Sequence, residues 1–129
     1  MGSRGAFVDV NIGNFTFKDG GQNYFSIGTL SSDPNVKVLI QNSGSVKAPE
    51  FSHTEGRVYA IVQDGQLKHL TYYDTEHKQH ISVDLLHSHG GVQPHIHIDL
   101  NHDPKSPGIP PTKEQMDLIN KIKKEYHLL

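Results

Sequence analysis

The stretch RVYAIVQDGQLKHLTYY, residues 57–73, decides the fold that we expect for this chain of 129 residues. Residues 57–63 and 66–73 are rich in β-branched and aromatic side chains, and they flank the dipeptide Asp64-Gly65. Aspartate followed by glycine favours a tight turn between antiparallel strands, because both residues accept a positive φ. The stretch therefore predicts a β-hairpin.

Two further strands are expected downstream of the hairpin. Residues 78–86 begin after a turn at 74–77, and residues 94–100 follow a loop at 88–93. Both segments alternate between apolar and polar side chains, as strands with one buried face do. The hairpin and these segments predict a small antiparallel sheet, consisting of a meander and the strand PHIHI.

The turn at 74–77 sets the expected register between the strands that it joins. If this turn contains four residues, Thr71 pairs with His80, and His69 pairs with Ser82. His69 would then lie on the same face of the sheet as the polar side chains of the next strand.

The alternation separates two faces of the sheet. The face expected to form the core carries Ile81, Val83, Leu85, Ile96, Ile98 and Leu100. The opposite face carries imidazole, hydroxyl and carboxylate groups, from His80, Ser82, Asp84, His95, His97 and Asp99. The face on which Arg57 lies depends on whether the hairpin loop holds two or three residues.

The flanking segments complete the expected α+β fold. Short strands at 7–10, 14–18 and 36–41 precede a loop at 42–49, and the four prolines of 101–111 predict an extended connector.

The segment 112–127 predicts a helix. Thr112 and Gln115 have the spacing of a capping box, and four apolar side chains then recur at helical spacing: Met116, Ile119, Ile122 and Tyr126. We expect one domain, 1–129, in which a small antiparallel sheet packs against this C-terminal helix, with residues 1–3 a remnant of cloning.

The amino-acid composition argues against several classes of function. There is no cysteine, so disulfides, cysteine-based zinc sites and cysteine nucleophiles are excluded. A formal net charge of −2 argues against a general polyanion-binding protein. No apolar run approaches the ~20 residues that span a bilayer, and no signal-peptide core is present, so we expect no membrane interaction.

Histidine is over-represented, and its distribution is uneven. Eight of the ten histidines fall between positions 69 and 102: His69, His77, His80, His87, His89, His95, His97 and His102. Scattered histidines on a solvated sheet face need no function. The stretch HSHGGVQPHIHID, residues 87–99, is a more specific signal of function. Strand alternation places His95 and His97 on the same face of the sheet, and the adjoining glycine-containing loop would bring His87 and His89 close to that face.

A metal site is one interpretation of this stretch. His-x-His on a strand sends two imidazoles to the same side, and His89 is a third ligand for zinc or another divalent transition metal. His87, Asp84 and Asp99 are alternative third ligands. The pattern resembles part of a cupin motif, but the downstream glutamate and glycine of that motif are missing.

Acid–base catalysis without a metal is the second interpretation. Two imidazoles that titrate near neutrality can take a proton from a ribose 2′-hydroxyl and return one to the 5′-oxygen. The cations available to stabilise the phosphorane are Arg57, Lys47 and Lys78. A third interpretation is an interaction module whose polar face is a docking surface without turnover.

The strings KQHISVDLLHSHGGVQPHIHIDLNH (78–102) and PGIPPTKEQMDLINKIKKEYHL (107–128) resemble small domains of prophage minor capsid or head-morphogenesis proteins, and related toxin modules of bacterial polymorphic toxin systems. The motif positions here are Asp84, His87, His89, Gly90, Gly91, Pro94, His95 and His97. The stretches RGAFVDVNIGNFTFKDGGQNY and APEFSHTEGRVYAIVQDG look like the phage-type version, so the resemblance covers most of the chain.

Such domains are grouped with nucleases of the barnase, EndoU, colicin and RelE-like kind. The resemblance implies an α+β fold and metal-independent RNA cleavage, in the host cytoplasm or the virion, with a capsid or immunity protein as partner. We expect His95 and His97 to act as general base and acid, with Asp84 orienting an imidazole. Gly90 and Gly91 would let backbone amides approach a phosphate. No cofactor is expected in this interpretation.

Overall fold

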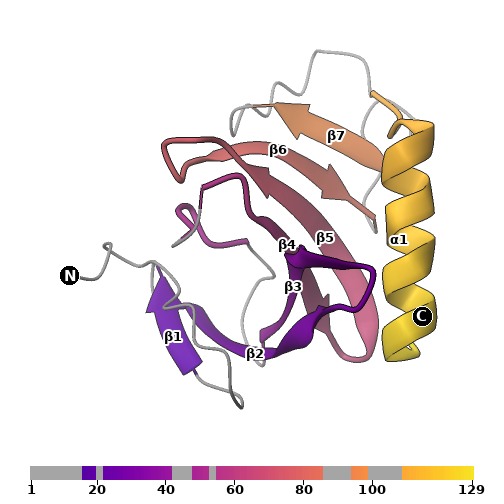
Figure 1. Ribbon diagram of the computed structural model, residues 1–129, viewed down its shortest axis with the longest axis horizontal. Helices are drawn as coiled ribbons and strands as arrows, with labels where there is room; N and C mark the ends of the chain where they lie inside the picture. Colours follow the sequence, from indigo (N-terminus) through magenta and orange to yellow (C-terminus); the bar gives the residue numbers. More distant parts are fainter. Residues whose placement is uncertain (1–15, 20–21, 42–47, 53–54, 86–93, 99–108) are drawn as a thin grey trace.

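The computed structural model describes residues 16–19, 22–41, 48–52, 55–85, 94–98 and 109–129 (Figure 1). Within these residues the chain forms one seven-stranded sheet and one helix, and the strand order follows the sequence. The elements are β1 (Thr16–Asp19), β2 (Gln22–Leu30), β3 (Asp33–Gln41), β4 (Val58–Gln63), β5 (Gln66–Tyr73), β6 (Gln79–Asp84), β7 (His95–Ile98) and α1 (Lys113–Tyr126). The expected α+β class is confirmed.

The sheet is antiparallel except at one position in its middle. β3 and β4 run parallel, with Val36 opposite Val58 and Val38 opposite Ala60. Two neighbouring strands that run in the same direction need a crossover between them, and residues 42–57 supply it. β2 was not predicted, and the expected strand at 7–10 lies outside the described residues.

The predicted hairpin between β4 and β5 is confirmed. Asp64 and Gly65 both have positive φ values, 56° and 73°, as a two-residue turn of this kind requires. A bulge between Ile61 and Val62 shifts the register, so that Ile61 pairs with His69 and Val62 pairs with Leu67.

The expected register between β5 and β6 is wrong by two residues. Thr71 pairs with Ser82 rather than with His80, and His69 pairs with Asp84 rather than with Ser82. The cause lies at the turn, where a bulge falls between Tyr72 and Tyr73 and the loop is longer than four residues. A shift of two residues keeps every side chain on its expected face.

Asp74 organises this longer turn. Its Oδ1 accepts hydrogen bonds from the backbone N–H groups of Glu76 and Lys78, each at 2.9 Å. These bonds, first that from Lys78, lower the pKa of the Asp74 carboxyl, which is therefore ionised at neutral pH. The turn closes with His77 in a left-handed conformation, at a φ of 67°.

The core lies between the sheet and α1, which runs along one side of the curved sheet in Figure 1. Ile119 and Ile122 of the helix are fully buried against strand residues that include Val38, Ala60 and Leu70. The predicted stripe is confirmed, because Met116 and Tyr126 pack against the same cluster. The apolar face predicted for residues 78–86 is confirmed at Val83 and Leu85, which are buried in this cluster, whereas Ile81 is only partly buried and lies outside it.

The capping box at the start of α1 is also confirmed. The backbone N–H of Gln115 donates to Thr112 Oγ1 at 3.1 Å, and the backbone N–H of Thr112 donates to Gln115 Oε1 at 2.8 Å. The helix ends at His127, whose left-handed conformation lets its N–H bond to the Lys123 carbonyl.

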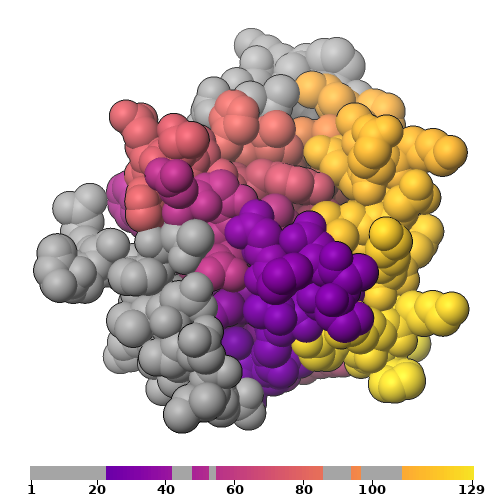
Figure 2. Space-filling model, in the orientation of Figure 1, coloured from indigo at the N-terminus to yellow at the C-terminus, as the bar shows by residue number. Residues whose placement is uncertain are grey.

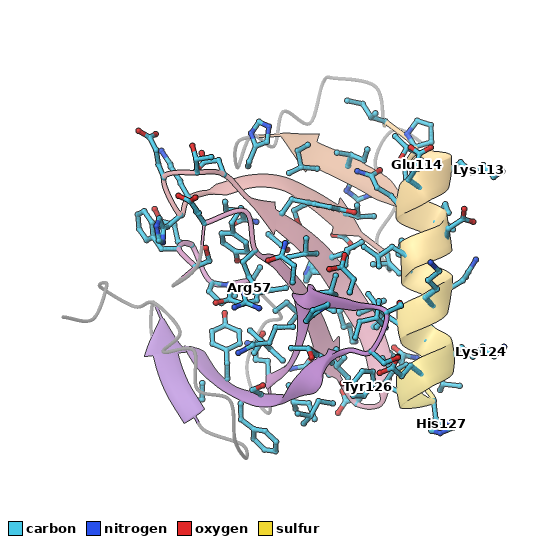
Figure 3. All side chains as sticks on the ribbon, in the orientation of Figure 1. Arg57, Lys113, Glu114, Lys124, Tyr126 and His127 are labelled. Carbon is cyan, nitrogen blue, oxygen red and sulfur yellow. The ribbon has the colours of Figure 1, made fainter. Side chains whose placement is uncertain are left out.

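The C-terminal end of α1 is tied to the turn between β2 and β3, and the two pack together in Figure 2. Ser31 Oγ donates to Glu125 Oε1 at 2.7 Å, and the Tyr126 hydroxyl donates to the Thr29 carbonyl at 2.6 Å. Burial, with the neighbouring Glu125 charge, raises the pKa of Tyr126, so this hydroxyl remains a donor at neutral pH. Tyr126 approaches the strand where Gly28 lies (Figure 3).

Replacing Gly28 by alanine should destabilise the protein by about 1–3 kcal/mol. Gly28 has a φ of 140°, and an added Cβ would lie 2.7 Å from the Tyr126 hydroxyl oxygen. Urea unfolding of G28A, Y126F and the double variant measures the effect. Because Y126F removes the clashing oxygen, G28A should cost less in that background, and fully additive losses would contradict this explanation.

Candidate functional site

The face of the sheet opposite α1 has two halves of different chemistry. The half on β2, β3 and β4 is an aromatic and aliphatic cluster that contains Tyr24, Leu39, Tyr59 and Ile61, together with Tyr73 of β5. The half on β5, β6 and β7 carries polar side chains instead. The cross-strand pairs place both halves on one continuous face, because Ile61 lies directly opposite His69.

The central feature of the polar half is a row of three residues on three adjacent strands, which we call the His–Asp–His row. His69 on β5 pairs with Asp84 on β6, and Asp84 pairs with His95 on β7. Directly opposite residues in antiparallel strands have Cβ atoms about 5 Å apart. The row thus places one carboxylate between two imidazoles.

The row is largely withdrawn from solvent. Asp84 is 8% exposed and His95 is 1% exposed, whereas His69 is partly buried. A buried carboxylate is costly unless cationic or hydrogen-bonding groups compensate it. The register places an imidazole at each directly opposite position, and a carboxylate that contacts an imidazole can fix its tautomer.

Neighbouring contacts hold His95 on this face. The backbone N–H of Ile96 donates to the Ile109 carbonyl at 2.8 Å, which ties β7 to the segment before α1. The Ile96 side chain packs against the core on the helix side. Because side chains alternate along a strand, His95 is directed to the opposite face.

A second row runs beside the first and is rich in hydroxyl groups. Tyr59 pairs with Thr71, Thr71 pairs with Ser82, and Ser82 pairs with His97. The buried hydroxyls of Thr71 and Ser82 lie 3.3 Å apart. His97 is in β7 by its backbone, and its side chain lies outside what the structure describes.

The structure does not bring Arg57 to the His–Asp–His row. This residue is buried just before β4, and its Nη1 donates to the Pro34 carbonyl at 3.3 Å (Figure 3). Its carbonyl accepts from the backbone N–H of Tyr73, four residues along β5 from His69. Four strand residues span about 13 Å, so Arg57 lies towards the aromatic half of the face.

A second predicted cation is also absent from the row. Lys78 is exposed in the turn before β6, and Lys47 lies outside the described residues. The sequence reasoning overlooked Lys37, a buried residue of β3 that is opposite Tyr59. Alternation along 36–41 would have identified its face. Lys37 is nevertheless three strands from Ser82, about 14 Å across the sheet.

The segment 48–52 crosses the aromatic half of the face and is fixed by main-chain hydrogen bonds. Ser52 N donates to the His77 carbonyl at 2.8 Å, and Gln79 N donates to the Glu50 carbonyl at 3.0 Å. The Tyr73 hydroxyl donates to the Pro49 carbonyl, and the Tyr73 ring packs edge-on against Tyr59. Ala48 also packs against this cluster, so the segment covers part of that half of the face.

The predicted loop residues His87, His89, Gly90 and Gly91 lie outside the described residues. Over the part of the chain that is described, no three His, Asp or Glu side chains are arranged to hold a metal ion. The zinc alternative with ligands His95, His97 and His89 therefore depends on two side chains that the structure does not describe.

Comparison of the sequence with protein-family models and with curated proteins, and of the fold with solved structures, returned no match. In the described part of the chain, no helix is long and apolar enough to cross a membrane. The class is therefore defined by geometry alone: an α+β domain with a buried carboxylate between two histidines on one sheet face.

Proposed function

We propose that this protein is a nuclease-like domain that cleaves RNA without a metal ion, with His95 as a catalytic acid–base group and Asp84 as its orienting partner. The observation that carries the proposal is the direct pairing of Asp84 with His95 on adjacent strands of a water-poor face. A carboxylate beside an imidazole fixes its tautomer and stabilises the imidazolium that forms during catalysis.

The reaction is a transesterification at a ribose phosphate. A neutral imidazole removes the proton of the 2′-hydroxyl, and the oxygen forms a bond to phosphorus while the bond from phosphorus to the 5′-oxygen breaks. An imidazolium returns a proton to the leaving 5′-oxygen, so the products are a 2′,3′-cyclic phosphate and a 5′-hydroxyl. We assign one step to His95 and the other to His97, which is two residues along the same strand.

Burial sets one condition on this mechanism. With 1% of its surface exposed, His95 contacts a substrate only when the structure opens around it. Movements of this kind are common in enzymes that exclude water from the reacting groups.

The resemblance to prophage capsid-associated and polymorphic toxin domains supports RNA as the substrate class. It also leads us to propose action in the cytoplasm of the host bacterium or in the virion, with a capsid or immunity protein as partner. These assignments rest on the motif that contains Asp84, Pro94 and His95.

The test is cleavage of mixed RNA by the purified protein in excess EDTA, combined with elemental analysis. Products that end in 2′,3′-cyclic phosphate, formed at an unchanged rate in EDTA, are the expected result. Intact RNA, or cleavage that stops in EDTA and returns with zinc, would overturn the proposal. Zinc bound in stoichiometric amount with a raised melting temperature would support the metal alternative instead.

A further inference from the structure

Two buried hydroxyl groups lie next to the His–Asp–His row and take no part in the proton transfers assigned to His95 and His97. Thr71 on β5 is directly opposite Ser82 on β6, and their hydroxyl oxygens are 3.3 Å apart. We call these two residues the hydroxyl pair. Thr71 is 0% exposed and Ser82 is 8% exposed. Ser82 is two residues before Asp84, so both side chains lie on the same face of β6.

The hydroxyl pair has one more proton than its own hydrogen bond uses. Each hydroxyl group has a single proton to donate, and only one of the two lies between the oxygens. Neither hydroxyl forms another hydrogen bond with the residues that the structure describes. If Ser82 donated, the remaining proton would be on the fully buried Thr71, which is the costlier arrangement. Thr71 is therefore the donor, and the Ser82 proton is directed to a further acceptor.

The position of Ser82 relative to His95 indicates which acceptor it meets. Asp84 is directly opposite His95 on the adjacent strand, so Ser82 is the diagonal neighbour of His95. Diagonal neighbours on one face of a sheet have Cβ atoms about 7–8 Å apart. A phosphate group that accepts one hydrogen bond on each side spans a distance of this order. A phosphate in contact with His95 is thus within reach of the Ser82 hydroxyl.

The proposed reaction also needs a group that stabilises negative charge on the phosphate oxygens. The expected cations Arg57 and Lys78 are not beside His95. The first donates to the Pro34 carbonyl, and the second is exposed in the turn before β6. A neutral O–H donor stabilises such a charge as well, where water is largely excluded. Ser82 is a donor of this kind on the strand next to His95.

We propose that Ser82 is a further catalytic residue, which donates a hydrogen bond to a non-bridging phosphate oxygen of the RNA while Thr71 donates to Ser82. This role rests on the proposed acid–base function of His95. The hydrogen bond strengthens as negative charge increases on that oxygen, so it stabilises the transition state more than the bound substrate. Ser82 transfers no proton, and the bonds that form and break are those of the transesterification.

The experiment compares the wild type, S82A and the control S26A on an RNA oligonucleotide with one cleavable linkage. Ser26 is a buried serine of β2, four strands from β6, and it is opposite Leu39 on the same face of the sheet. S82A should lower kcat by about 10²-fold, and S26A should change it by no more than about twofold. Sulfur is a weak hydrogen-bond acceptor, so replacing the contacted oxygen by sulfur should slow the wild type and S26A but not S82A.

A second measurement needs no cleavage. Uridine 3′-monophosphate is titrated into each protein as a probe that carries a ribose phosphate, and binding is followed by NMR of the backbone amides. The probe should shift the Ser82 amide resonance of the wild type. S82A should bind it about tenfold more weakly than S26A does, because a hydrogen bond to a charged phosphate is lost.

The two measurements separate this inference from the proposed function. If RNA is cleaved and S82A behaves as S26A does, the role of Ser82 is overturned and the nuclease function is retained. If RNA stays intact but S82A weakens binding of the probe, the phosphate contact is supported and the nuclease function is rejected. Intact RNA with no binding, or with equal binding by S82A and S26A, overturns both. The sulfur effect and the Ser82 shift in the wild type decide the question if S82A does not fold.

Discussion

Replacing His95 by glutamine should lower the rate of RNA cleavage by about 10²–10⁴-fold, the usual contribution of a positioned acid–base group. Glutamine keeps a polar group of similar length beside Asp84 but cannot gain or lose a proton near neutral pH. The loss should appear in kcat rather than in KM, because the imidazole transfers a proton in the transition state and does not contribute to substrate binding. Initial rates on a single-site RNA oligonucleotide in EDTA measure both constants.

The matched control for H95Q is H80Q, which removes an exposed imidazole from the adjacent strand and should leave the rate within about twofold. Melting temperatures of both variants show whether the buried substitution has also weakened the fold.

D84N extends the test, because an amide cannot select the same tautomer of His95. If His95 and Asp84 act as a unit, the double variant H95Q/D84N should be no slower than H95Q alone. Multiplicative losses, or an unimpaired H95Q, would contradict the assigned roles.

Local signals in the sequence were sufficient for several elements of the fold. The hairpin turn at Asp64-Gly65 and the capping box at Thr112 depend on contacts between near neighbours, and both were predicted correctly. The parallel pair of β3 and β4 and the unexpected β2 depend on contacts between distant segments. The bulge beside Tyr73 shifts the register at the next turn, and no residue type in the sequence predicts this bulge.

The candidate site shows the same division between local and long-range information. Strand alternation predicted that His69, Asp84 and His95 share a face, and for His69 this survives the error in the β5–β6 register because a shift of two preserves parity. That shift nevertheless decides which residues are opposite one another, so the pairing of His69 with Asp84 could not be predicted. The positions of Arg57 and Lys37 depend on which strands become neighbours, which alternation alone does not determine.

Truncation of Ile119 to alanine should destabilise the protein by about 2–5 kcal/mol, the range for deleting a buried aliphatic side chain. Ile119 is 0% exposed and belongs to the cluster that joins α1 to the sheet. Domains have a total stability of about 5–15 kcal/mol, so this change removes a large part of it. Urea unfolding should show a lower midpoint with an unchanged m-value.

The control for I119A is the neighbouring exposed position, N120A, which should alter the free energy of unfolding by no more than about 0.5 kcal/mol. A loss below about 1 kcal/mol in I119A would mean that α1 is not needed to cover this side of the sheet.

The variant I119A also tests whether the core supports the candidate site. Val83 and Ile96 pack with Ile119 on the helix side, while Asp84 and His95 are the next residues on the same strands and face the opposite way. The helix therefore stabilises the β6–β7 pairing that places the carboxylate opposite the imidazole, and I119A should lose cleavage activity and its native near-UV signal at the same urea concentration.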